Sequence, residues 1–164
     1  MRLMLWLSFV ISVYCISNTS FAQSGQIPYT VSINPASATI RIGDDVVLRV
    51  ILTNISHAPV LYGSLDLRHG EFNYDVKVIT ADGTIPPRTE FGKDPIRSKL
   101  PSGRSIRREY TTLNPGDEVH QSIVLNSLYD MTRPGSYIVR VSKKLNNLGD
   151  ANLVSNAVTV TMVP

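Results

Sequence analysis

The stretch that decides the fold is Val46–Asn54, which reads V-V-L-R-V-I-L-T-N. Its even-numbered positions carry Val, Leu, Val and Leu up to residue 52, whereas Arg49 and Thr53 mark the opposite face. Strict alternation of apolar and polar residues indicates a β-strand with one face in a hydrophobic core. Because Val47 and Ile51 make the second face partly apolar, we expect this strand to lie in the centre of its sheet.

Similar short runs, rich in β-branched and aromatic residues, continue along the chain and are separated by Gly, Pro, Asn and Asp. Helical periodicity is almost absent, so nothing is available to connect parallel neighbouring strands. The pattern therefore predicts an all-β protein, an antiparallel β-sandwich of seven to nine strands. The expected strands span residues 29–34, 39–42, 46–54, 60–67, 74–80, 106–113, 119–125, 137–143 and 155–163.

A corner near the C-terminal end gives the sandwich an immunoglobulin-like character. Residues 130–139 read D-M-T-R-P-G-S-Y-I-V. In an immunoglobulin tyrosine corner, a Tyr stands two residues before the second core cysteine and its hydroxyl binds backbone upstream. Tyr137 takes that place here, and Val139 stands where the cysteine would be. We assign a structural role to the corner residues Asp130, Pro134, Gly135 and Tyr137.

Motifs on both sides of the corner contribute to a resemblance that covers a longer part of the chain. They include Leu113–Glu118 (L-N-P-G-D-E), Leu128–Asp130 and Ala58–Leu61. Over roughly 100 residues, from Val46 to Lys143, the chain resembles the small β-sandwich domain that precedes the catalytic domain in deuterolysin-type secreted metallopeptidases. A weaker resemblance links it to the bacterial intracellular proteinase inhibitor family. No H-E-x-x-H string is present, so the resemblance implies a fold and an accessory role, and transfers no catalytic residue.

The first 22 residues have the order of a secretory signal peptide. Arg2 is followed by an apolar run from Leu3 to Ile16 and by small residues before a cleavage site after Ala22. The apolar run is shorter than a membrane span. We therefore expect an exported domain at residues 23–164, periplasmic or extracellular in a bacterial cell, with no transmembrane span after cleavage.

The cysteine count and the distribution of charge limit the classes of function that the domain can have. The one cysteine, Cys15, lies in the predicted signal, so the mature domain is expected to be free of disulfides and of thiol chemistry. Residues 82–108 form a basic, proline-rich loop in which seven cations face two acids between residues 88 and 108. Long loops in small domains often carry function. The candidate anion-binding residues are Arg88, Lys93, Arg97, Lys99, Arg104, Arg107 and Arg108.

Catalytic and metal sites are disfavoured. His57, His69, Asp66 and Glu71 could converge on zinc, but their spacing does not require it. No G-x-S-x-G elbow is present. We expect no cofactor and no metal, and nucleic acid is disfavoured because Phe91 is the sole aromatic residue in the basic stretch from Arg88 to Arg108.

The favoured function is a non-catalytic binding or accessory module that contacts a protein or an anionic envelope component through the basic loop. The alternatives are a proteinase inhibitor acting through residues 84–105, and a hydrolase. The partner and the oligomeric state stay open.

Overall fold

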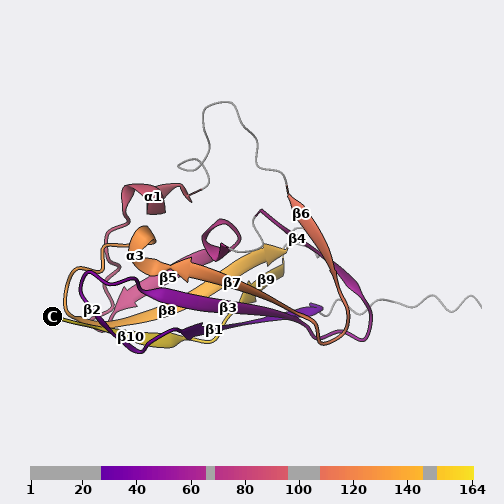
Figure 1. The fold of residues 1–164 in the computed structure, drawn as a ribbon, viewed down its shortest axis with the longest axis horizontal. Helices are drawn as coiled ribbons and strands as arrows, with labels where there is room; N and C mark the ends of the chain where they lie inside the picture. Colours follow the sequence, from indigo (N-terminus) through magenta and orange to yellow (C-terminus); the bar gives the residue numbers. More distant parts are fainter. Residues whose placement is uncertain (1–26, 66–68, 96–107, 146–150) are drawn as a thin grey trace, which may run out of the picture.

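The computed structural model describes residues 27–65, 69–95, 108–145 and 151–164, and these residues form a β-sandwich (Figure 1). The predicted signal peptide at residues 1–22 lies outside the described residues. The first sheet has the order β1-β3-β7, with bounds Tyr29–Pro35, Val47–Asn54 and Glu118–Val124. The second has the order β2-β10-β8-β5, with β9 also paired to β8. Its bounds are Thr39–Arg41, Val158–Val163, Gly135–Leu145, Asp75–Thr80 and, for β9, Ala151–Val154.

The core lies between these sheets and follows the predicted alternation. On β3, Leu48, Val50 and Leu52 are fully buried, and on β8, Val139 and Val141 face them from the second sheet. Each such side chain contributes about 1.5 to 3 kcal/mol of transfer free energy when it leaves water. The prediction of an all-β sandwich is confirmed.

One strand pair departs from the antiparallel expectation. β2 runs parallel to β10, with Thr39 opposite Thr161 and Arg41 opposite Val163. The chain leaves the first sheet after Pro35 and enters the second sheet at Thr39, so it changes sheet without a hairpin. A strand that continues in the same direction on the other sheet needs no helical crossover, which is why the sequence argument missed this pair.

A third, two-stranded sheet pairs β4 (Val60–Ser64) with β6 (Glu109–Leu113) and stands at one end of the sandwich (Figure 1). It continues β3 and β7 beyond a corner that the side chain of Asn54 holds. The Asn54 amide is buried and donates hydrogen bonds of 2.9 Å to the carbonyl oxygens of Ala58 and Leu113. Asn54 is therefore a structural residue of this corner.

Several predicted boundaries differ from the observed ones. Between residues 84 and 95 the expected long loop contains the short helix α1 (Glu90–Lys93), which begins where the Thr89 hydroxyl accepts a hydrogen bond from Gly92 N. A second short helix, α3 (Leu125–Leu128), replaces the expected end of a strand. The two helices are in contact, and a Cβ atom on Gly92 would lie 1.9 Å from the Leu128 carbonyl oxygen.

The last predicted strand, 155–163, starts later and is preceded by an unpredicted one. β9 ends at Val154 and β10 begins at Val158. Between them, the side chain of Asn156 accepts from Ile33 N at 2.9 Å and donates to Ile33 O at 3.0 Å. This link to β1 takes the segment out of the second sheet. β4 ends at Ser64, three residues before the end of the predicted strand 60–67, and β6 starts at Glu109, three residues after the start of the predicted strand 106–113. Of the residues left over, Leu65 and Arg108 are not in a strand, and the others lie outside the described residues. Within the described ranges, no helix is long and apolar enough to span a membrane.

Candidate functional site

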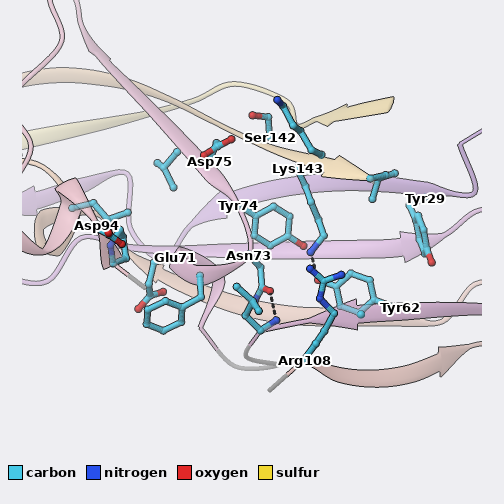
Figure 2. A pocket seen from close by; sticks show the side chains of 18 of the residues that line it. Tyr29, Tyr62, Glu71, Asn73, Tyr74, Asp75, Asp94, Arg108, Ser142 and Lys143 are labelled. Atoms are coloured by element: carbon cyan, nitrogen blue, oxygen red, sulfur yellow. Dashed lines mark hydrogen bonds between the residues drawn. The ribbon is translucent and has the colours of Figure 1, made fainter. Parts of the chain in front are cut away.

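An open pocket of about 450 Å³ lies where β4 comes close to the ends of β5 and β8. Figure 2 shows side chains from these separate elements pointing toward one another. Five cationic and three acidic residues line it within the described residues. They are Arg88, Lys93, Arg108, Lys143 and Lys144 against Glu71, Asp75 and Asp94.

Lys143 is one of the cations that line this pocket. It continues the inward-facing series of β8 that begins with Tyr137, Val139 and Val141, so its side chain enters the end of the sandwich. Its Nζ donates to the Tyr62 hydroxyl at 3.2 Å and lies 4.7 Å from the centroid of the Tyr62 ring. It also lies 5.2 Å from the centroid of the Tyr74 ring. A cation held over two aromatic faces gains cation–π stabilisation.

The ammonium group of Lys143 has an altered acidity. Burial and, to a smaller extent, the neighbouring positive charge of Arg108 lower the pKa of Lys143 from 10.5 to about 8. No described carboxylate forms an ion pair with Lys143 or with Arg108. The two cations therefore share one end of the pocket without a counter-charge among the described residues.

Two tyrosines complete this group. Tyr62 is 2% exposed and donates its hydroxyl to Gln121 Oε1 at 3.2 Å. Tyr74 is 6% exposed, and its buried hydroxyl has no hydrogen-bond partner among the described residues. Burial raises the pKa of both phenols above the ordinary value, so both remain protonated at neutral pH. We call Tyr62, Tyr74, Arg108 and Lys143 the cationic cluster.

Glycine at position 63 makes room for one member of the cluster. An added Cβ atom on Gly63 would lie 2.9 Å from the Tyr110 ring and 3.1 Å from Arg108 Cδ. The Arg108 stem thus crosses β4 where no side chain stands. Figure 2 shows its guanidinium group beside the Tyr62 ring and the Lys143 amine.

The predicted basic residues fall into three groups. Arg108 belongs to the cationic cluster. Arg88 and Lys93 line the pocket but already have partners, because Arg88 donates to Gly92 O at 2.8 Å and lies 5.1 Å from the Tyr129 ring centroid, and Lys93 pairs with Glu90 at 2.5 Å. The remaining four, Arg97, Lys99, Arg104 and Arg107, lie outside the described residues.

The corner residues lie outside the pocket lining. The Tyr137 hydroxyl donates to the Arg133 carbonyl oxygen at 2.8 Å, four residues upstream. Asp130 accepts from the Thr132 hydroxyl and from Thr132 N, and these hydrogen bonds lower the pKa of Asp130. Gly135 has a φ of 140°, which favours glycine after Pro134.

The histidines and acids considered for zinc do not converge within the described residues, which hold no group of three or more metal-ligating side chains. Asp66 is outside those residues. The His69 ring packs against Phe72 at a centroid distance of 6.2 Å. Glu71 lines the pocket, and its Oε2 atom is buried with no hydrogen-bond partner in the described ranges.

Sequence reasoning missed Lys143, Tyr62 and Tyr74. The signal was present for two of them: the alternation that places Val139 and Val141 in the core also places Lys143 there, and Tyr74 starts the inward series of β5. Their meeting with Tyr62 depends on the sheet β4–β6, whose position is set by contacts distant in the sequence.

Comparison of the chain with protein-family models and with curated proteins finds no match. Among solved structures, a CARDB domain from Pyrococcus furiosus is similar at 14% identity and a TM-score of 0.39, over 82% of this chain and 87% of that one. A β-glucosidase from Erythrobacter marinus is similar at 12% identity and a TM-score of 0.42, over 82% of this chain but 15% of the enzyme. An alkylpurine DNA glycosylase from Pseudomonas fluorescens is similar at 15% identity and a TM-score of 0.38, over 82% of this chain and 30% of the enzyme.

Proposed function

We propose that this domain is an exported, non-catalytic binding module that captures an acidic segment of another protein in the pocket around the cationic cluster. The observation that carries the proposal is Lys143, a half-buried cation beside a second cation, Arg108, with no carboxylate partner among the described residues. Buried charges are normally paired, because an unpaired charge has lost its hydration without compensation. An acidic partner would supply the missing counter-charge.

The surroundings of the pocket favour a protein partner over a lipid surface. Among the described strands β4 pairs only with β6, so its second edge has no strand neighbour. Leu61 and Tyr110 line the pocket and are 61% and 60% exposed. A free strand edge, exposed apolar side chains and a cationic pocket together suit an extended acidic segment that adds to β4. This is the accessory role that the resemblance to the deuterolysin-type module implies.

The chemistry of the cluster supports binding over catalysis. A hydrolase would need a nucleophile hydrogen-bonded to a base, and the hydroxyl bonded to Lys143 is that of Tyr62, whose raised pKa keeps it protonated. The proposal of export rests on the sequence of residues 1–22.

Fluorescence anisotropy tests the proposal, with a labelled octapeptide of alternating Glu and Val and a matching peptide of Lys and Val. The double variant Lys143→Gln/Arg108→Gln should bind the acidic peptide at least about tenfold more weakly, since each charged hydrogen bond contributes about 1.5 to 3 kcal/mol. Lys77→Gln/Arg140→Gln is the matched control, because these exposed residues face each other on β5 and β8 and do not line the pocket.

Three results would contradict the proposal. One is equal binding of the acidic peptide by the two double variants. Another is equal affinity of the protein for the two peptides. The third is binding to phosphatidylglycerol vesicles with no binding to the acidic peptide, which would assign the pocket to a lipid surface.

A further inference from the structure

We infer that the cationic cluster is an oxyanion site that holds one carboxylate or phosphate group between Lys143, Tyr74 and Arg108. The inference deepens the proposed function and rests on it for biological meaning, because it names the chemical group of the partner that enters the pocket.

Lys143 brings donors that the fold does not use. An ammonium group has three N–H donors, and the hydrogen bond to Tyr62 accounts for one of them. The Tyr62 proton is directed to Gln121, so the Tyr62 oxygen is the acceptor of this bond. Within the described part of the chain, the two tyrosines and Arg108 face the amine from other elements, and none of them offers it a negative charge.

Tyr74 brings a second donor. Its side chain is more than nine-tenths buried, and its hydroxyl lies near that of Tyr62 but forms no hydrogen bond of normal geometry with any described residue. Figure 2 shows this hydroxyl directed toward the Lys143 amine. A buried unsatisfied hydroxyl is destabilising, and a bound oxyanion between the phenol and the amine would accept a hydrogen bond from it.

Arg108 closes the site from the solvent side. Its stem passes over Gly63, and its guanidinium group presents a planar fork that matches the oxygens of a carboxylate or a phosphate. Three donors thus come together: Lys143 from β8, Tyr74 from the residue before β5, and Arg108 from the residue before β6. An oxyanion between them would accept hydrogen bonds from all three. Carboxylate and phosphate share this chemistry.

The test is nuclear magnetic resonance of the purified protein with ¹³C-labelled lysine, titrated separately with acetate and with inorganic phosphate at a constant ionic strength kept with chloride. We expect a saturable shift of the Lys143 signal with at least one of the two anions, while the Lys77 signal does not saturate. Tyr74→Phe should weaken this binding about tenfold and leave the melting temperature unchanged or higher, because the removed hydroxyl has no partner. Arg108→Gln should weaken it by a similar factor.

The two anions distinguish between the groups that the partner could carry. Saturation by acetate supports a carboxylate group, and saturation by phosphate alone supports a phosphorylated group. Both results support an oxyanion site. No saturable shift with either anion would overturn the inference, as would unchanged binding in Tyr74→Phe and Arg108→Gln. If the anions bind as expected but the acidic peptide does not, the oxyanion site stands and the proposed function fails. If the peptide needs Lys143 and Arg108 but no anion saturates, the function stands and the oxyanion site fails.

Discussion

Replacing Lys143 by methionine tests the unusual environment of this side chain through the pH dependence of stability. In the folded protein the pKa of Lys143 is about 8, below the ordinary 10.5 of an exposed lysine. Between these two values the unfolded chain binds a proton that the folded chain does not, so the wild-type protein gains stability as pH rises through this window. Lys143→Met has no such proton, and its stability relative to the wild type should fall over the same range.

The magnitude follows from the shift. At about 1.4 kcal/mol per pKa unit, most of the effect falls between pH 7 and 9.5, and it amounts to about 2 kcal/mol before screening by solvent. Because the side chain is partly exposed, we expect about 1 to 2 kcal/mol. The facing groups Tyr62 and Tyr74 have raised pKa values, so their contribution is lost only above pH 10, outside this range.

Urea unfolding of the wild type, Lys143→Met and Lys77→Met at pH 7, 8, 9 and 9.5 measures the effect. Lys77 is an exposed residue of β5 and is the matched control. The free energy of unfolding of the wild type minus that of Lys143→Met should rise with pH, whereas the difference for Lys77→Met should not. A constant difference for Lys143→Met, or one that falls with pH, would refute the assignment of a buried, unpaired ammonium group.

Three further substitutions have expected outcomes. Arg108→Gln should raise the pKa of Lys143, because it removes a like charge, and a nuclear magnetic resonance titration that finds it unchanged or lower would contradict the proximity of the two groups. Tyr137→Phe should lower the free energy of unfolding by about 1 kcal/mol, since it removes the hydrogen bond that closes the corner, and equal urea midpoints would show that this bond contributes nothing. Gly92→Ala should destabilise the protein by about 1 to 3 kcal/mol, because its Cβ would overlap the Leu128 carbonyl oxygen, and an unchanged melting temperature would rule out the close contact of α1 with α3.

The strands that alternate strongly could be predicted from sequence, and the elements that depend on distant partners could not. The apolar face of Val47–Asn54 specifies both its conformation and its buried side, so local pattern was enough. β9 and β10 are separate because Asn156 binds Ile33, 123 residues away, and no local signal marks that contact. The parallel pair β2–β10 has the same origin, since it depends on where the chain changes sheet.

For the candidate site, too, one part could be predicted from the sequence and another part could not. The charge pattern pointed to residues 88–108, and Arg108 from that stretch lines the pocket. Lys143 follows the inward-facing Val139 and Val141 on β8, and it is half-buried beside Tyr62, 81 residues earlier in the chain. A charge count treats every lysine as a surface charge. Only the folded arrangement distinguishes the lysine that has lost its hydration.

The parallel pairing of β2 with β10 affects how the domain responds to tension along the chain. Strands that run parallel are drawn past each other when tension acts on the chain before β2 and after β10. The backbone hydrogen bonds between the two segments are then loaded at the same time. They include Thr161 N to Ala38 O and Ile42 N to Val163 O, each 2.8 Å long. An antiparallel pair pulled from its open end separates one bond at a time. Tension applied at the start of β2 and at the end of β10 would therefore load the hydrogen bonds of this short pair together before the two strands separate.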